Sequence, residues 1–393
     1  MRALAGFTCL AALGLAMPHS AIAQGCTAAI AHAVDRIAGT RAALRALPNG
    51  DLDPMLPKTA QRSIVRMKAA VSVYVEAQMA CLDSDAEAGA ITQALNRPLE
   101  PLQCTGDCPT EPYGTAPTFE ARRWNGSLVG IVARIGIMCG SDAMLFVYAY
   151  DRGQWRESLR WHSAPYADVS GAFEAFDYRI SPRDETGRWY VLASSIAPWC
   201  SSTWSSIRYA ALRPSGDVAR PKILLSASDE IYWGTEDFGK LVAEPREFDV
   251  RFHAGSIDMG VHNRVWIRHF ALDGDKVRRT APVALSPRDF VDEWIVSPWA
   301  LAARWSAAER RPALARLHAQ LHDAKNTSFE LAAIHACAGA MPRYEVDLSS
   351  DRDEDDWFFS VRGGQDFMLT DIRRKADPAC GGDDLRVSMS TRN

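Results

Sequence analysis

The sequence predicts a mainly β fold preceded by an N-terminal α-helical hairpin. Before residue 96, apolar residues recur with the helical period. From Phe119 onwards they form short runs rich in β-branched and aromatic residues, separated by Gly, Asp, Ser and Pro, which is typical of strands and turns. Strand–turn–strand segments also recur about every 60 residues. We therefore expect repeated antiparallel hairpin units in a propeller-like arrangement, with a β-sandwich as the alternative.

The composition is that of a globular protein with a slightly acidic balance. Of the 393 residues, 47% are hydrophobic and 23% are charged, and the formal net charge is −4. This composition allows a substantial buried core. Non-specific binding to nucleic acid requires a basic surface, so we expect no nucleic-acid partner. After the leader, no apolar run reaches the roughly 18 residues that span a bilayer, so we expect no transmembrane segment.

Residues 1–23 have the pattern of a secretory signal peptide. A positively charged start and an apolar segment precede Ala21-Ile22-Ala23, a small-x-small cleavage site that leaves Gln24 as the mature N-terminus. The protein is therefore expected to be exported to the periplasm or the extracellular space. Lipid attachment at Cys26 is the less favoured alternative, because Gln24 suits such a site poorly.

The mature chain keeps eight of the nine cysteines, an even number that predicts disulfides in an exported protein. Because the count does not fix the connectivity, we pair the cysteines by their expected places in the fold. The alternative is that some of them are buried free thiols. The predicted pairs are Cys26–Cys81, Cys104–Cys108, Cys139–Cys200 and Cys337–Cys380.

Residues 24–96 are predicted to form the helical hairpin. Its first helix spans Thr27–Leu47 and its second helix spans Leu56–Leu82. A short connector makes the two helices antiparallel, which brings Cys26 beside Cys81 and is the reason for pairing them. The hairpin is interpreted either as a packed appendage or as a module that docks a partner protein.

A short third helix, Ala86–Leu95, is predicted before a Pro-rich linker over residues 97–118. Cys104 and Cys108 lie in this linker with three residues between them. A redox-active pair usually has two intervening residues, and a zinc site needs further ligands at matched spacing. We therefore expect a small structural disulfide loop.

Residues 119–393 are predicted to form the mainly-β domain. Its three clearest hairpins each carry a turn glycine, and these glycines are 63 and then 58 residues apart. Asp-Gly and Ser-Gly in the turns supply the positive φ that tight hairpins require. The hairpins are Leu145–Trp161 with Gly153, Ile207–Leu225 with Gly216, and Val265–Leu285 with Gly274.

A strand is predicted before each of these hairpins. The first two of these strands end at Cys139 and Cys200, so a disulfide between neighbouring units is expected there. The predicted strands are Leu128–Met138, Trp189–Trp199 and Phe248–Asp258.

A fourth unit matches the pattern more loosely, with a strand at Phe329–Ala336 and a turn at Arg362–Gln365. Residues 297–325, between the third and fourth units, are predicted to be a helical insertion. Ser306–Glu309 has the capping-box pattern of a helix start. Pro312 is expected to kink or restart the helix.

No metal or cofactor is predicted. His318 and His322 are spaced so that two imidazoles can share a metal, but no obvious third ligand follows them. Asp351, Asp353 and Asp355 alternate as calcium ligands do, yet the loop lacks the required glycine and the closing Glu. We interpret the histidines as the polar edge of a helix and the aspartates as a solvated turn.

No catalytic motif stands out. The acidic pairs Asp229-Glu230 and Asp292-Glu293 are of the kind that glycosidases use, but their separation across a cleft cannot be read from the sequence. No Gly-x-Ser-x-Gly elbow and no phosphate-cradling loop occurs. Whether the protein is an enzyme is therefore left open.

The tryptophans are the most unusual feature, since all twelve follow Phe119. Trp199, Trp204 and Trp233 are predicted at strand ends or in loops, where an indole can stack on a sugar face. The alternative is that most of the indoles fill the core.

Together, these features predict an exported, disulfide-stabilised, non-catalytic binding or interaction protein of the cell envelope or secreted space. Its expected partner is an envelope glycan or a protein. The alternative is an exported hydrolase that acts on glycans or esters, with a site assembled from loops.

Overall fold

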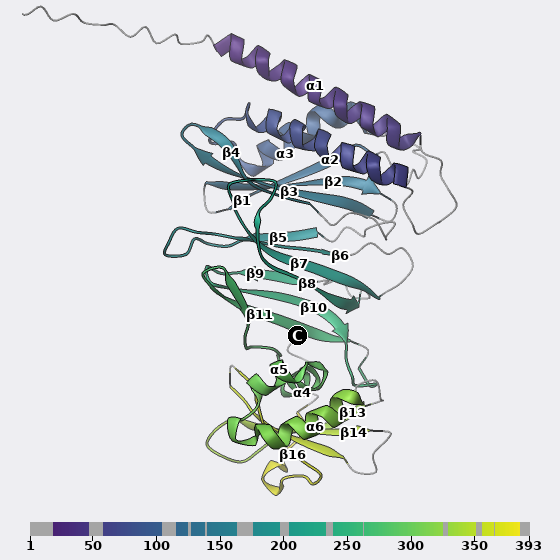
Figure 1. The fold of residues 1–393 in the computed structure, drawn as a ribbon, viewed down its shortest axis with the longest axis vertical. Helices are drawn as coiled ribbons and strands as arrows, with labels where there is room; N and C mark the ends of the chain where they lie inside the picture. Colours follow the sequence, from purple (N-terminus) through teal and green to yellow (C-terminus); the bar gives the residue numbers. More distant parts are fainter. Residues whose placement is uncertain are drawn as a thin grey trace, which may run out of the picture. The chain divides into compact units, whose positions relative to one another are not determined.

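A computed structural model describes the chain over residues 19–46, 58–103, 115–124, 127–137, 140–162, 176–196, 204–232, 239–261, 263–324, 329–350, 356–364 and 366–385. The described residues form helices and four antiparallel sheets of four strands each, so the protein is mainly β (Figure 1). The chain divides into two compact units. The first contains the N-terminal helices and most of the first sheet, and the second begins at Leu159.

The first unit contains the predicted helical hairpin. Helices α1 (His19–Arg45) and α2 (Lys58–Met79) lie side by side, and α3 (Ala88–Asn96) is followed by the 3₁₀ turn η1 (Arg97–Leu102) (Figure 1). A stripe of residues spaced three or four apart is buried along α2, because such residues share one face of a helix. This stripe consists of Ile64, Met67, Val71, Tyr74 and Gln78.

The start of α1 differs from the prediction, since the helix begins at His19 rather than at Thr27. The proposed cleavage site, Ala21–Ala23, lies within this helix. The remainder of the leader lies outside the described residues, so the signal peptide stays a prediction. Among the described residues, none of the helices combines the length and the apolar character needed to cross a bilayer.

A disulfide joins Cys26 to Cys81 across the hairpin, with their Cα atoms 5.8 Å apart. A second disulfide joins Cys337 to Cys380 in the second unit. Both are pairings that the sequence analysis assigned. The other predicted pairs, Cys104–Cys108 and Cys139–Cys200, lie outside the described residues.

The first sheet packs with the helices in one compact unit. Asn96, at the end of α3, pairs with the backbone of Phe119. Its side-chain oxygen accepts from the Phe119 N–H at 3.0 Å, and its side-chain nitrogen donates to the Phe119 carbonyl at 2.9 Å. Lys68 of α2 forms an ion pair with the fully buried Asp142 at 2.7 Å. The strands, in sheet order, are β1 (Thr118–Trp124), β2 (Leu128–Ile137), β3 (Gly140–Asp151) and β4 (Gln154–His162).

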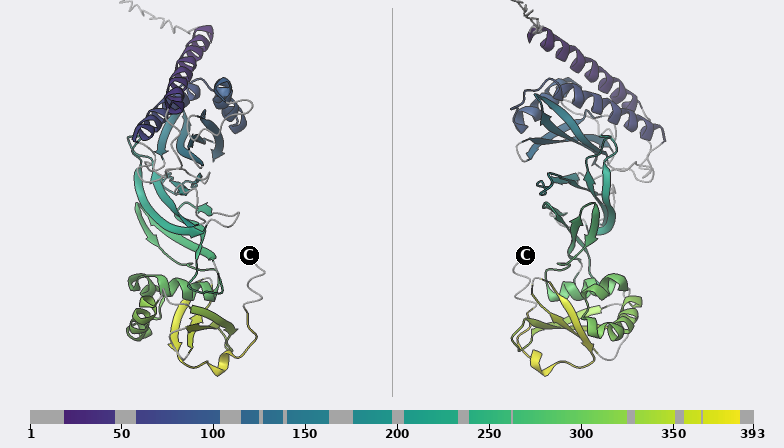
Figure 2. Two further views of the ribbon diagram at one scale, coloured as in Figure 1. Left: turned by 90° about the vertical axis from the view of Figure 1, so that its right-hand side faces the viewer. Right: turned by 60° about the vertical axis from the view of Figure 1, so that its left-hand side comes forward.

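The second and third sheets belong to the second unit and lie side by side there (Figure 2). They share one apolar core. Alternate residues of β10 face this core, among them Phe248, Val250 and Phe252. The second sheet consists of β5 (Phe176–Ile180), β6 (Val191–Ile196), β7 (Trp204–Arg213) and β8 (Lys222–Tyr232). The third consists of β9 (Lys240–Ala243), β10 (Glu247–Gly255), β11 (Asn263–Asp273) and β12 (Lys276–Arg279).

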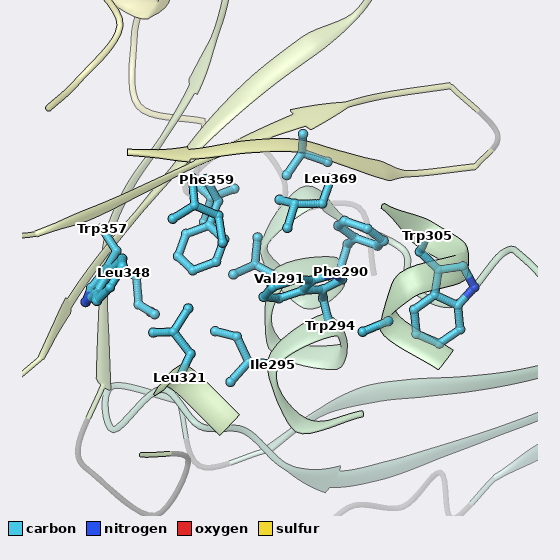
Figure 3. Packing of buried hydrophobic residues seen from close by; sticks show 14 of the residues in the cluster. Phe290, Val291, Trp294, Ile295, Trp305, Leu321, Leu348, Trp357, Phe359 and Leu369 are labelled. Atoms are coloured by element: carbon cyan, nitrogen blue, oxygen red, sulfur yellow. The ribbon is translucent and has the colours of Figure 1, made fainter. Parts of the chain in front are cut away.

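The fourth sheet packs against the helical insertion around the fully buried Trp294 (Figure 3). Phe290 and Ile295 of the first insertion helix, together with Leu348, Phe359 and other sheet residues, form this core. The helices are α4 (Pro287–Val296), α5 (Trp299–Ala302) and α6 (Arg311–Asp323), and the 3₁₀ turns η2 (Ala303–Trp305) and η3 (Ala308–Arg310) separate α5 from α6. The strands are β13 (Phe329–Ala336), β14 (Arg343–Ser350), β15 (Trp357–Arg362) and β16 (Met368–Arg373).

The helical insertion starts ten residues earlier than predicted, at Pro287 rather than at residue 297. Ser286 caps α4, because its side-chain oxygen accepts from the Asp289 N–H at 3.1 Å. Ser306 does not act as a cap. Its hydroxyl instead donates to the Ala302 carbonyl at 2.8 Å and accepts from the Trp294 indole at 2.9 Å.

The repeat of four-stranded units corresponds to the sheets, each of which is a simple up-and-down meander. Gly153 and Gly274 occupy tight turns with φ of 88° and 62°. Gly216 does not, because β7 and β8 are joined by the longer connection 214–221. No closed barrel or propeller is found within the described residues, so the propeller-like arrangement stays a prediction.

We expect replacement of both Cys26 and Cys81 by serine to lower the unfolding free energy of the first unit by about 4 kcal/mol, because the bridge closes a 55-residue loop. Urea denaturation followed by tryptophan fluorescence measures the change. The matched control replaces Cys337 and Cys380, whose bridge lies in the second unit. An unchanged transition of the first unit in the Cys26/Cys81 variant would contradict the expectation.

Candidate functional site

A cleft of about 500 Å³ lies in the second unit, where strands of the second and third sheets meet. Strands β7 and β8 supply one part of its lining, and β10 and β11 supply the other. The lining combines aromatic rings, two carboxylates, one guanidinium and two small residues of β10. Its residues are Trp204, Asp229, Glu230, Phe252, Ala254, Gly255, Trp266 and Arg268.

Trp204, the first residue of β7, lies against the backbone of β10. A Cβ atom on Gly255 would come within 3.3 Å of the Trp204 ring, so the missing side chain makes this close approach possible. Tyr232, the cross-strand neighbour of Trp204 on β8, meets its ring edge-on with centroids 5.1 Å apart. These contacts hold the indole at the cleft.

Trp266 provides the second indole of the cleft. It lies opposite Phe252 in the β10–β11 ladder, and its ring N–H donates to the Gly255 carbonyl at 3.1 Å. The Arg264 guanidinium lies 3.9 Å from the centre of the Trp266 ring, and the Arg268 guanidinium lies 4.7 Å from it. Two cation–π contacts and one hydrogen bond therefore fix this ring.

Arg268 joins the cleft to the interior. Its Nη2 donates to Asp229 Oδ1 at 2.7 Å, and its Nε lies 3.3 Å from both oxygens of that carboxylate. Its Nη1 donates to Glu293 of α4 at 3.0 and 3.2 Å. Tyr209 donates to the remaining Asp229 oxygen at 2.8 Å. Burial and the nearby Asp229 raise the pKa of Tyr209, so its hydroxyl stays a donor at neutral pH.

Glu293 is the centre of a buried ionic network, with only 1% of its surface exposed. Besides Arg268, it accepts from Arg279 at 2.6 Å and from Arg264 at 3.3 Å. Burial alone would raise its pKa, but the three guanidinium groups lower the pKa of Glu293 to about 2. It is therefore ionised at neutral pH and cannot serve as a general acid there.

Asp292 completes the network beside Glu293. It forms an ion pair with Arg264 at 2.9 Å and accepts a hydrogen bond from the Ser256 hydroxyl at 2.7 Å. Arg264, Arg268 and Arg279 thus balance three carboxylates, those of Asp229, Asp292 and Glu293. Strand β11, strand β8 and helix α4 are joined by charges that water hardly reaches.

Some of the candidate residues predicted from the sequence lie at the cleft, and others lie outside the described residues. Trp204 lines the cleft, whereas Trp199 and Trp233 lie outside the described residues. Both acidic pairs are near this site. Asp229 and Glu230 line the cleft, and the second pair, Asp292-Glu293, is joined to it through Arg264 and Arg268.

Sequence reasoning missed the three residues of β11 that build the site. Arg264, Trp266 and Arg268 occupy every second position in the first half of β11, in alternation with Val265 and Ile267. The period of two places them on one face. This alternation is the signal that could have identified them.

His318 and His322 contact the backbone where α4 ends. Nε2 of His318 lies 3.1 Å from the Trp294 carbonyl and 2.9 Å from the Ser297 carbonyl, and Nδ1 of His322 lies 2.8 Å from the Ile295 carbonyl. Both rings thus satisfy carbonyl groups at a helix C-terminus. In the part of the chain that the structure describes, no three His, Cys, Asp or Glu side chains are grouped to hold a metal. The aspartates at 351, 353 and 355 lie outside that part.

No protein-family model matches the sequence, and no curated protein matches it. The functional conclusion therefore depends on the chemistry of the cleft.

We expect Glu293→Gln to lower the unfolding free energy of the second unit by about 3 kcal/mol at pH 7, because the change leaves the three guanidinium groups short of one negative charge. The folded pKa of Glu293 is below its unfolded value of 4.5. The wild-type protein therefore has this stability above pH 4.5 and loses it as the pH falls towards 2.

Urea denaturation at a series of pH values tests both parts of this expectation, and the variant should show a flatter dependence between pH 4.5 and 2. Glu309→Gln is the matched control, because Glu309 is exposed. Equal stability of wild type and Glu293→Gln at pH 7 would show that the network does not stabilise the fold.

Proposed function

We propose that this protein is an exported, non-catalytic binding protein of the cell envelope or secreted space, and that the cleft beside Trp204 binds a carbohydrate. The observation that carries the proposal is the lining itself, which places two indoles among fixed polar groups. A sugar ring has one apolar face and a rim of hydroxyl groups. An indole provides a flat apolar surface on which the apolar face can stack. Carboxylates and backbone carbonyl groups can accept hydrogen bonds from the hydroxyl groups.

The fixed charges favour binding over catalysis. Asp229 accepts from Arg268 and Tyr209, and Glu293 is held ionised by its arginines. A hydrolase acting on glycans needs one carboxyl group that carries a proton and a second that is free to react. The ion pairs remove Glu293 from such a role and occupy Asp229, so the hydrolase alternative has less support.

The disulfides and the absence of a membrane-crossing helix among the described residues fit a secreted protein. Disulfides persist in oxidising compartments such as the periplasm and the extracellular space. The signal peptide predicted over residues 1–23 agrees with this location. The docking of a partner protein by the helical hairpin remains a separate prediction.

We also propose that the four sheets are propeller-like units. Each is a four-stranded meander, as a propeller blade is, and the second and third sheets pack through a shared apolar core.

Trp204→Ala is expected to weaken oligosaccharide binding about tenfold, because one stacking surface is lost. A glycan array of envelope and extracellular polysaccharide fragments identifies the ligand, and isothermal titration calorimetry measures its dissociation constant. Trp204→Phe keeps an aromatic face and should retain part of the affinity. Trp299→Ala is the control, because Trp299 packs on the core around α4 and does not line the cleft.

Two results would count against the proposal. One is the absence of any saccharide that the wild-type protein binds. The other is saccharide binding that Trp204→Ala and Trp299→Ala weaken equally.

A further inference from the structure

We infer that the cleft selects a saccharide that carries a free amine, an amino sugar in its ammonium form, over neutral and acidic sugars. This inference rests on the proposed function and adds the charge of the ligand to it. It follows from the pairing of the charged side chains at the cleft. Some of them form ion pairs with a described residue of opposite charge, and one does not.

The positive charge at the cleft is not available to a ligand. Arg268 directs its Nε and Nη2 to Asp229 and its Nη1 to Glu293, so its guanidinium is held on both sides by carboxylates. Its side chain is also only 10% exposed. An acidic sugar would have to displace one of these carboxylates and leave it buried without its partner, which is costly. The cleft is therefore poorly suited to an anionic ligand.

The negative charge at the cleft exceeds the positive charge. Arg264, Arg268 and Arg279 are balanced by Asp229, Asp292 and Glu293, as the ion pairs above show. Glu230 also lines the cleft and is exposed, and its carboxylate forms no ion pair with another residue that the structure describes. One unmatched carboxylate therefore remains.

Trp204 provides the aromatic surface for a cation. Trp266 already holds two guanidinium groups over its ring, at 3.9 and 4.7 Å, and their charge would repel a further cation there. Trp204 adds a second indole to the same cleft. An ammonium group beside an indole and a carboxylate gains from the π cloud and from the opposite charge together.

An amino sugar fits this combination better than a simple amine. Its ring has an apolar face for the indole, its hydroxyl groups can form hydrogen bonds with the polar groups of the lining, and its ammonium group can pair with Glu230. A lysine side chain supplies the ammonium group but no ring face to stack. The ligand class is therefore a glucosamine-type oligosaccharide.

The test compares three oligosaccharides of equal length by isothermal titration calorimetry with the full mature chain: a glucosamine oligomer, its N-acetylated counterpart and a uronic acid oligomer. We expect the glucosamine oligomer to bind at least fivefold more tightly than the other two, with an affinity that falls as salt is added. Glu230→Gln should weaken its binding about fivefold, and it should weaken binding of the acetylated oligomer by a smaller factor, because only the hydrogen bonds and not the ion pair are changed there. Glu309→Gln, an exposed carboxylate outside the cleft, should change neither.

Each of the other outcomes rejects one stated part of the proposal. Equal affinity for the amine and acetylated oligomers, with no effect of Glu230→Gln, rejects the charge selection and leaves carbohydrate binding intact. Binding of a lysine-rich peptide as tightly as the glucosamine oligomer rejects the assignment to a sugar. Failure of all three oligosaccharides to bind, together with an empty glycan array, rejects the proposed function itself.

Discussion

Three guanidinium groups converge on one carboxylate, that of Glu293, inside the second unit. Each of these charges has lost most of its contact with water, and an unpaired charge at such a place costs several kcal/mol. The groups must therefore meet with good geometry, or the fold is strongly destabilised. This requirement fixes the position of α4 against β11, and through Arg268 it fixes β11 against β8. A buried network of this kind specifies an arrangement even where its net contribution to stability is small.

The properties of the cleft follow from this network. Arg268 holds Asp229, and Arg264 and Arg268 both lie against the ring of Trp266. The positions of the polar groups and of the Trp266 indole are therefore fixed before a ligand binds, which reduces the entropy lost on binding. The same ion pairs withdraw carboxylates from acid–base chemistry. A rigid lining in which the charges are paired, apart from one carboxylate, is suited to selective binding.

The core around Trp294 supports the network from the other side of α4. The Trp294 indole donates to Ser306, and its ring meets His318 edge-on with centroids 4.7 Å apart. His318 and His322 satisfy the carbonyl groups where α4 ends. Burial lowers the pKa of His318, which keeps its ring neutral among these apolar neighbours. The helix that carries Glu293 is thus held at its apolar face and at its C-terminus.

Local sequence patterns determined the helices of the first unit, most strands of the sheets and the cysteine pairs that the structure describes. The stripe of α2 and the alternation of β10 depend only on residues a few positions apart, because helical and strand periods are local properties. The sequence also identified Trp204 and both acidic pairs as candidates. It did not reveal α4, although Phe290, Val291, Trp294 and Ile295 recur three or four positions apart. Only the tertiary structure decided which charges meet. Glu293 and Arg268 lie on a helix and a strand that are separated in the chain, and Asp229 belongs to a different sheet. Ion pairs between such segments depend on packing, and no spacing in the sequence encodes them.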